Sequence, residues 1–340
     1  MTGTSAGIVD AHNDLLLEVA FRSLRQGEPL AFGHHWLPHL QRGRILLQVC
    51  PLYADLSVLP EGALRQVLGQ VAAFERAVHE NRSEIVAVKT ASDLRLAERG
   101  ERIGVMLSLE GGEPLGYDVW MAEVFWSLGV RMIGLTWNRR NPFADGAAED
   151  GPGGLSQLGR QLVDVCVELG MVIDLAHASA PTFWELLERT EGAPIVVSHA
   201  ACRAVYDHPR NLSDEQLSAL AAHGGVLGIM QHPLSIDPAT PTIDRVIDHI
   251  DHAVEVMGAD RVGLGSDFTQ QIVRAVGWVP PPDALLQPAL LPDAAIESLA
   301  GPQDYPNLVN RLRQRGYHGE RLKAILGGNL LRVIRRSLPP

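Results

Sequence analysis

The sequence predicts a (β/α)8 barrel, in which eight parallel strands close into a ring surrounded by helices. Eight short apolar or β-branched runs alternate with amphipathic helical stretches along the chain, a pattern typical of βα units with a parallel sheet. The first run leads into His12-Asn13-Asp14, whereas an open doubly wound sheet usually has a glycine-rich phosphate loop at that place. We therefore favour the closed barrel and keep the open sheet as the structural alternative.

The predicted strands are short runs rich in Val, Ile and Leu. In the first run, the alternation of a strand puts His12 and Asp14 on one face, with Asp10 behind them. The expected strands are Ile8–Asp14, Arg44–Cys50, Ile103–Leu109, Met132–Leu135, Val172–Leu175, Ile195–Ser198, Val226–Ile229 and Val262–Ser266. Because the chemistry of such barrels lies at the carboxyl ends of the strands, the residues that end these runs are the candidate site.

Amphipathic stretches occupy the intervals between these runs. The expected helices are Gly62–Asn81, Tyr117–Leu128, Leu155–Leu169, Pro181–Arg189, Asp214–His223 and Ile243–Met257. A single α/β barrel can take up a chain of this length. We therefore expect one domain over residues 1–340, with a C-terminal helical extension.

The composition is that of an ordinary globular protein, with 46% hydrophobic and 20% charged residues and a formal net charge of −11. The sequence contains no run rich in Lys or Arg, so we expect no nucleic-acid partner. Cys50, Cys166 and Cys202 lie far apart, which favours a reducing cytosol over a disulfide framework. Residues 1–7 lack the features of a signal peptide, and no hydrophobic tail follows Leu330. We expect a cytoplasmic protein without a membrane partner.

Several predicted strands stop at a residue type that binds metal ions. These residues are His12, Asp14, Glu110, His177, His199 and Asp267. One such ending is weak evidence, and His12 alone would more simply be a hydrogen-bonded core histidine. Imidazole and carboxylate groups are the usual protein ligands of zinc, and the strand ends of a barrel open into one mouth. The coincidence of several such endings therefore predicts a metal site.

These residues stand in motifs that resemble the membrane (renal) dipeptidases, peptidase family M19 of the metal-dependent amidohydrolase superfamily. The motifs are His12-x-Asp14, Leu109-Glu110-Gly111-Gly112, Asp174-Leu175-Ala176-His177, Ser198-His199, His208-Pro209-Arg210-Asn211 and Gly265-Ser266-Asp267-Phe268. The stretch from Tyr305 to Arg332 is also similar to the end of that family. The resemblance covers essentially the whole chain and implies a (β/α)8 barrel with a binuclear zinc site, in a soluble bacterial-type member.

The resemblance also implies a role for each metal-type residue. His12 and Asp14 would bind one zinc ion, and His177 and His199 would bind the second. Glu110 would bridge the two ions and would thereby take part in catalysis. Two neighbouring metal ions can activate a shared water and polarise a carbonyl. The residue types therefore suit the hydrolysis of an amide.

Two further residues would handle the substrate, again by resemblance. Arg210 would bind its free carboxylate, for which a guanidinium offers a matching fork. Asp267 would act as the catalytic acid and base that passes a proton to the leaving amine. The implied activity is the hydrolysis of dipeptides with a free C-terminal carboxylate, L,D-dipeptides included, and family analogy suggests a homodimer.

The sequence departs from the family pattern at two places. The mammalian members have a histidine after the Leu-Thr of the fourth strand, where this chain has Trp137 followed by Asn138. Trp137 donates only through its indole N–H, so either Trp137 or Asn138 takes over substrate binding there, or the metal ions act without such a group. Thr269-Gln270 stands where the family often has Asp-Gly, which changes the eighth loop.

The remaining histidines are expected to have structural roles. We expect a polar loop over the barrel mouth for His34, His35 and His39. We expect a solvated helix face for His249 and His252, which lie three residues apart. We expect His208 to orient the loop that carries Arg210 rather than to act in the site.

Other polar and aromatic residues receive equally simple interpretations. Asp10 and Asp174 are expected to be buried, hydrogen-bonded carboxylates rather than ligands. Cys202 is expected to be a free buried thiol. Packing between helices and barrel is expected for three tryptophans, namely Trp120, Trp126 and Trp184.

Three functions are open at this point. The leading one is a zinc dipeptidase. The second keeps the barrel and the metal ions but cleaves another amide, a lactam or an ester, which the departure at Trp137 motivates and Arg210 opposes. The third is a non-catalytic binding protein, since a fold alone does not prove activity. The presence of all the expected ligands together with Asp267 argues against this third function.

Overall fold

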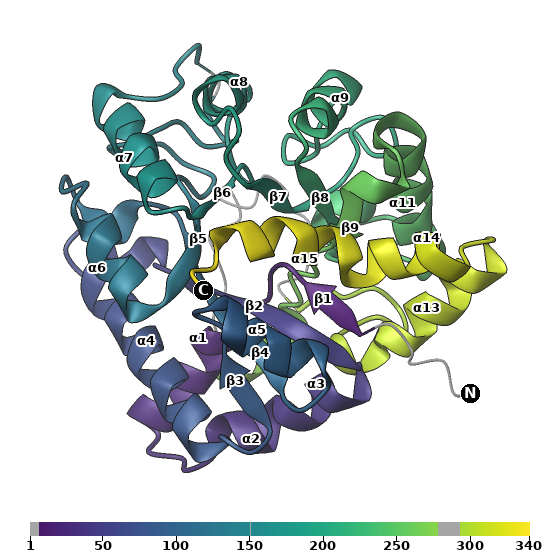
Figure 1. Ribbon diagram of the computed structural model, residues 1–340, viewed down its shortest axis with the longest axis horizontal. Helices are drawn as coiled ribbons and strands as arrows, with labels where there is room; N and C mark the ends of the chain where they lie inside the picture. Colours follow the sequence, from purple (N-terminus) through teal and green to yellow (C-terminus); the bar gives the residue numbers. More distant parts are fainter. Residues whose placement is uncertain (1–6, 150, 278–292) are drawn as a thin grey trace.

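The computed structural model describes residues 7–149, 151–277 and 293–340, and these residues form the predicted (β/α)8 barrel. Their parallel strands make one sheet in the order β2-β1-β9-β8-β7-β6-β5-β4-β3, and an additional pairing of β2 with β4 closes eight of them into a ring. Helices surround this ring, and the colours in Figure 1 run around it from the purple β1 to the green β9. The fold class predicted from the sequence is confirmed.

All eight predicted runs are strands, with ends shifted by a few residues. The strands are β1 (Ile8–Asp10), β2 (Ile45–Tyr53), β3 (Ile85–Ala87), β4 (Ile103–Glu110), β5 (Val130–Gly134), β6 (Val172–Asp174), β7 (Ile195–Ala200), β8 (Val226–Ile229) and β9 (Val262–Leu264). The sequence did not predict β3, because three residues are too few to show a period. It pairs with the first residues of β4 and stands outside the ring of eight.

The helices follow the strands in the alternation that the sequence predicts. They are α1 (Leu15–Ala20), α2 (Ala31–His35), α3 (Leu37–Arg42), α4 (Ala63–Glu80), α5 (Ala91–Glu98), α6 (Met121–Leu128), α7 (Gln157–Glu168), α8 (Ala180–Arg189), α9 (Asp214–Ala222), α10 (Pro233–Ile236), α11 (Ile243–Met257), α12 (Gln270–Val276), α13 (Tyr305–Gln314), α14 (Gly319–Lys323) and α15 (Asn329–Ile334). Hydroxyl side chains cap several of them. Ser156, Ser179, Ser213 and Thr242 each accept a backbone N–H of the first turn of α7, α8, α9 and α11, which satisfies a donor that the helix itself cannot pair. Within the described ranges, no helix combines the length and the apolarity needed to cross a membrane.

Apolar side chains pack in two layers, one inside the barrel and one between strands and helices. The inner layer includes Val9, Leu47 and Met106, and Leu330 and Ile334 of α15 join it. Figure 1 shows α15 crossing the barrel in yellow. It meets the amino end of β9, since Asn329, its first residue, donates to the carbonyl oxygens of Ala259 and Val262. The polar site therefore lies at the opposite, carboxyl end.

Two predictions about surface and core are wrong. His249 is fully buried rather than solvated, because α10 and the segment after β7 cover that face of α11. The His249 ring accepts the Cys202 N–H at 3.1 Å and lies 2.9 Å from the Ile236 carbonyl oxygen. Trp120 and Trp184 are 55% and 43% exposed, so they do not pack between helices and barrel, since helix periodicity alone does not say which face is covered.

The histidines near the start of the chain lie in helices rather than in a loop. His34 and His35 belong to α2 and His39 to α3, and Pro38 occupies a first-turn position of α3, where proline favours a helix. The expectations for three buried polar residues and one tryptophan are met. Asp10, Asp174 and Cys202 are buried, and Trp126 packs partly buried against the core with the Arg131 guanidinium 3.8 Å above its ring.

Candidate metal centre

The residues predicted from the strand ends come together at the carboxyl end of the barrel. They lie in the last residues of β4 and β7 or in the segments that follow β1, β6 and β9. These residues are His12, Asp14, Glu110, His177, His199 and Asp267. They are buried or nearly so, so their polar atoms need partners within the site itself.

The segment after β1 brings two of these side chains together. Regular pairing of β1 ends at Asp10, four residues earlier than the sequence predicts. Backbone bonds from Ala11 N to the Leu264 oxygen (2.9 Å) and from Asn13 N to the Val49 oxygen (3.2 Å) still hold the segment between its neighbours. Asp14 is the last residue before α1. In this segment, His12 Nε2 lies 3.6 Å from Asp14 Oδ2.

Glu110, the last residue of β4, contacts three histidines with one carboxylate. Its Oε1 lies 2.9 Å from His177 Nε2 and 3.7 Å from His199 Nε2. Its Oε2 lies 3.6 Å from His12 Nε2. One oxygen thus faces the pair of histidines from β6 and β7, and the other faces the β1 side of the site.

His177 and His199 point their Nε2 atoms at each other, 2.8 Å apart. The Nδ1 of each ring contacts an oxygen on the far side. Asn138 Oδ1 lies 2.7 Å from Nδ1 of His177, and Ser198 Oγ lies 2.7 Å from Nδ1 of His199. Partners of this kind orient metal-binding imidazoles and hold the second nitrogen toward the ion. The sequence offers little sign of these partners beyond the position of Ser198 directly before His199.

The charges of the site differ from one imidazole to the next. Burial lowers the pKa of His12, but the carboxylates of Glu110 and Asp14 outweigh burial and raise it to about 10. Burial lowers the pKa of His177 and of His199 well below the usual value, so both are neutral. Neutral imidazoles are the form that binds metal ions.

The residues present fit divalent cations. Two groups of possible ligand atoms occur in the described part of the chain, His12 with Glu110 and His199, and His12 with Asp14 and Asp267, with atoms of each group within 4.8 Å of one another. Two buried atoms, His12 Nε2 and Asp14 Oδ1, have no hydrogen-bond partner. Such atoms are costly unless a ligand satisfies them. A set of nitrogen and carboxylate donors with excess negative charge suits zinc and similar ions.

Asp267 and Arg210 border this group. Burial raises the pKa of the Asp267 carboxyl, and the nearby Asp14 carboxylate adds to the shift. Arg210 is 4% exposed, and burial lowers the pKa of its guanidinium to about 10, so it stays positive at neutral pH. It donates to the His199 carbonyl oxygen at 3.2 Å, and its backbone N–H bonds Nδ1 of His208 at 3.2 Å. His208 thus orients the Arg210 loop.

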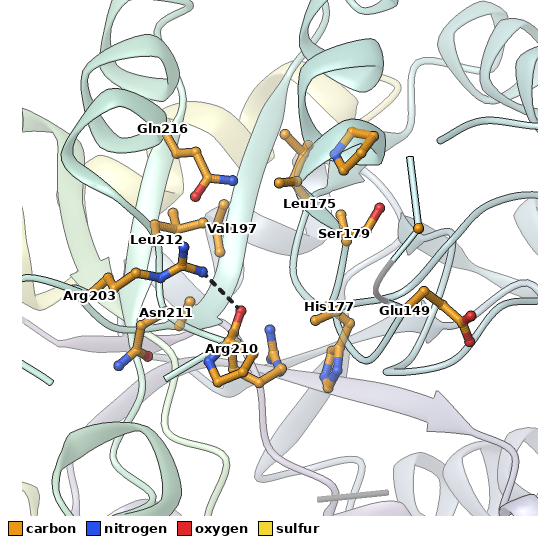
Figure 2. Close-up of a pocket in the computed structure, with 17 residues that line it drawn as sticks. Glu149, Leu175, His177, Ser179, Val197, Arg203, Arg210, Asn211, Leu212 and Gln216 are labelled. Atoms are coloured by element: carbon orange, nitrogen blue, oxygen red, sulfur yellow. Dashed lines mark hydrogen bonds between the residues drawn. The ribbon is translucent and has the colours of Figure 1, made fainter. Parts of the chain in front are cut away.

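A cavity of about 230 Å³ adjoins the centre, and both His177 and Arg210 line it. Figure 2 shows these two side chains at one border of the cavity, with Leu175, Leu212 and Gln216 on the other sides. A positive group beside a histidine of the candidate centre is an arrangement that can hold an anionic small molecule.

Trp137 lies beside the centre as well. Its ring centroid is 5.8 Å from that of His177 and 5.5 Å from that of Tyr53 in β2. The two aromatic rings pack with Leu17 and Leu56 into a small apolar cluster. The residue at which the sequence departs from the family pattern therefore forms part of the wall of the site.

Comparison with known sequences shows that this chain is similar to one family. The model of the membrane dipeptidases (Peptidase family M19) matches residues 3–279. Dipeptidase verJ of Clonostachys rogersoniana is 30% identical over 274 residues, which is 80% of this chain and 65% of that protein. An uncharacterized dipeptidase of Schizosaccharomyces pombe is 31% identical over 359 residues, which is 98% of this chain and 80% of that protein. The chain thus spans just under two thirds of the first of these relatives.

Comparison with solved structures agrees in fold. A metallo peptidase from Rhodobacter sphaeroides, solved with a phosphinate mimic of the dipeptide L-Ala-D-Ala, superposes with a TM-score of 0.84 at 21% identity. The superposition covers 98% of this chain and 100% of that one. At this level of identity the likeness concerns the barrel fold.

Proposed function

The chain belongs to the membrane dipeptidase family, peptidase family M19, and on this basis we propose that it is a binuclear zinc dipeptidase. The proposed substrates are dipeptides with a free C-terminal carboxylate, L,D-dipeptides included. The observation that carries the proposal is the Glu110 carboxylate, which contacts His12, His177 and His199 at once. We further propose that the protein acts in the cytoplasm, and a homodimer stays a prediction.

In the proposed enzyme, the two ends of the site each hold one zinc ion. His12 and Asp14 hold the first, and His177 and His199 hold the second. Glu110 serves both, since its two oxygens face opposite sides of the site. When bound, a pair of such ions activates water at neutral pH and polarises the scissile carbonyl.

Arg210 selects the substrate in this proposal. Its buried guanidinium binds the C-terminal carboxylate of a dipeptide in a paired, charge-assisted geometry. This contact limits the leaving part to a single residue, which distinguishes a dipeptidase from a longer-range peptidase. His199 supports the position, because its carbonyl oxygen accepts an Arg210 N–H.

Asp267 moves the proton in this proposal. Burial raises the pKa of its carboxyl, and a raised pKa suits a group that must accept a proton and then give it to the leaving amine near neutral pH. Asp267 shares one ligand-type group with His12 and Asp14. Its carboxylate thus lies beside the two residues that would hold the first ion.

A second candidate keeps the metal ions but cleaves another amide, a lactam or an ester. The observation in its favour is Trp137, whose ring fills the space beside His177. Asn138 contacts Nδ1 of His177, and this contact suits a residue that orients a ligand. We propose that Trp137 and Asn138 contact the substrate.

A substrate panel with one matched variant tests the proposal. Zinc-loaded protein is assayed on L,L- and L,D-dipeptides, with an EDTA-treated sample beside it. Arg210→Gln is expected to lower kcat/KM for the best dipeptide by more than ~100-fold, mainly through KM, because a buried charge-assisted pair is lost. Arg131→Gln removes another buried guanidinium, one that bonds Lys89 and Trp126 carbonyls away from the site, and is expected to keep kcat/KM. An unchanged kcat/KM in Arg210→Gln on the true substrate would favour the second candidate.

A further inference from the structure

Two buried aspartates that the proposed metal centre does not use occupy equivalent places in the barrel. Asp10 ends β1 and Asp174 ends β6. Asp10 pairs with Leu264 of the neighbouring strand, and Asp174 pairs with Val196 of its own neighbour. Two residues beyond each partner stands a serine, and the next residue belongs to the site.

The first aspartate joins the segments that carry His12 and Asp267. Asp10 Oδ1 accepts the N–H of His12 at 3.2 Å and the N–H of Ser266 at 2.8 Å. Asp10 Oδ2 accepts the Ser266 hydroxyl at 2.6 Å. Asp267 N in turn bonds the His12 carbonyl oxygen at 3.0 Å. One fully buried carboxylate thus sets the spacing between the two segments.

The second aspartate repeats this arrangement on the other side of the site. Asp174 Oδ1 accepts the N–H of Ala176 at 3.0 Å and the N–H of Ser198 at 2.8 Å. Ala176 precedes His177, and Ser198 precedes His199. Here the serine hydroxyl is turned away from the aspartate and contacts Nδ1 of His199.

Both arrangements hold a site residue in an uncommon backbone conformation. Asp267 has φ +54° and His177 has φ +63°, in the left-handed region that residues other than glycine rarely adopt. Such residues keep this conformation only where the surrounding structure determines it strongly. The hydrogen bonds to Asp10 and Asp174 fix the residues next to both of these positions.

We propose that Asp10 and Asp174 are positioning residues, which fix the backbone of the metal centre from outside it. Asp10 positions His12 and Asp267, and Asp174 positions His177 and His199. Neither contacts a metal ion or the substrate. The proposal rests on the proposed function for its turnover readout, whereas its zinc readout is independent of the reaction.

Alanine and asparagine variants at both positions separate the effect of losing the hydrogen-bond acceptor from the effect of losing the negative charge. Asp10→Ala and Asp174→Ala remove the acceptor and leave two backbone N–H groups without it. Asp10→Asn and Asp174→Asn keep an oxygen at the Oδ1 place. At position 10 the new amide N–H can donate to Ser266 Oγ, whose hydroxyl then donates to the His12 carbonyl oxygen, already 3.0 Å away.

Asn329→Ala is the matched control. Asn329 is buried and donates to the Ala259 and Val262 carbonyl oxygens at the amino end of β9. Its loss takes a donor from the buried Val262 carbonyl oxygen of the strand that leads to Asp267 and from the Ala259 carbonyl just before that strand, at the opposite end of the barrel. This variant reports the cost of an unpaired backbone group away from the site.

The measurements are the affinity for Zn²⁺ by chelator competition, kcat and KM on the best dipeptide, and Tm. We expect the Ala variants to bind Zn²⁺ at least ~10-fold more weakly, as is typical when a residue that orients metal ligands is lost. We expect Asp10→Ala to lower kcat further at saturating zinc with little change in KM. The Asn variants should restore both properties to within about threefold. Asn329→Ala should lower Tm but keep zinc affinity and kcat.

Wild-type zinc affinity and kcat in both Ala variants, with only Tm lowered, would overturn the proposal. If the Ala variants do not fold, Ser266→Ala decides for the first aspartate. Ser266→Ala removes one bond to Asp10 and should lower kcat severalfold at unchanged zinc content, and an unchanged kcat would count against the proposal. A loss of zinc affinity in Asp174→Asn beyond tenfold would show that charge, not the acceptor, matters.

A wild type that binds zinc but cleaves no dipeptide refutes the reaction and leaves the affinity ratios as the test of the aspartates. A wild type that binds no divalent metal overturns both.

Discussion

At the scale of single residues, one residue type takes two electrostatic states in the same site. The carboxylates of Glu110 and Asp14 raise the pKa of His12 to about 10, so that a bound cation would have to displace its proton, whereas burial lowers the pKa of His177 and His199 and keeps both neutral. The Nε2 atoms of all three point at Glu110. The negative charge of Glu110 therefore favours a cation in the site.

Removal of that charge is expected to loosen metal binding. Glu110→Gln should weaken Zn²⁺ binding by more than ~100-fold, because loss of a direct ligand exceeds the 10–100-fold typical of an outer partner. Zinc content after dialysis, measured by elemental analysis, checks this. Glu113→Gln changes a neighbouring carboxylate that bonds Asn141 instead and should keep full zinc. Full zinc in Glu110→Gln would argue against the bridging role.

Loss of the proposed acid and base should have the opposite profile. Asp267→Asn keeps the shape of the side chain but cannot carry a proton to the leaving amine. Zinc content should stay at the wild-type level while kcat falls by roughly 10²–10⁴-fold, the usual contribution of general acid–base catalysis. Asp207→Asn, at a side chain that is 91% exposed, should leave kcat unchanged. A kcat near wild type in Asp267→Asn would assign the proton transfer to another group.

Single residues also show how much of the candidate site can be predicted from the sequence. The grouping of His12, Glu110 and His177 could be predicted, because each is a residue of a metal-binding type at the carboxyl end of a predicted strand. Asn138 and Ser198 contact the histidine rings, but many polar residues in loops look the same in sequence. Their roles depend on which ring lies opposite, and that follows from the folded barrel.

At the scale of elements, the amphipathic period predicts where α11 lies but not what covers it. The predicted and observed bounds of α11 agree. The prediction for His249 is wrong, because the short helix α10 and the Cys202 segment pack over that face. β1 is likewise shorter than predicted, because the backbone leaves regular pairing after Asp10. His12 and Asp14 lie in the segment that follows.

The buried His249 makes stability depend on pH. Burial lowers its pKa from 6.5 to about 4, so between these values the unfolded chain binds a proton that the folded chain does not. Its contribution to stability is complete above about pH 6.5 and is lost as the pH falls toward 4. Between pH 7 and pH 5 the wild type should lose about 2 kcal/mol more unfolding free energy than His249→Gln.

Urea unfolding at both pH values measures this difference. The other titrating groups are common to the two proteins, so their contributions cancel in the comparison. Equal losses of unfolding free energy in wild type and His249→Gln would contradict the assignment of this pH dependence to His249.

At the scale of the whole molecule, the candidate metal centre connects strands that are distant along the chain. Its residues lie at or just after the carboxyl ends of β1, β4, β6, β7 and β9, and the opposite end of the barrel is filled by α15. The barrel could be predicted from the alternation of strands and helices. The plug by α15 could not, because its apolar residues look like those of any outer helix.

Since the proposed ions would bind side chains from four of these strands, β1, β4, β6 and β7, metal removal is expected to destabilise the whole barrel. A ligand present at 100 times its Kd stabilises the native state by about 2.7 kcal/mol. With an unfolding entropy of about 2.1 cal/mol/K per residue, this corresponds to a fall in Tm of roughly 4 °C for a chain of this size. Differential scanning calorimetry of zinc-loaded and EDTA-treated protein measures the shift. Glu110→Gln should show little response to EDTA, because its site is already weakened. A wild-type Tm unchanged by EDTA, in protein shown to have lost its metal, would mean that the ions do not hold these strands together.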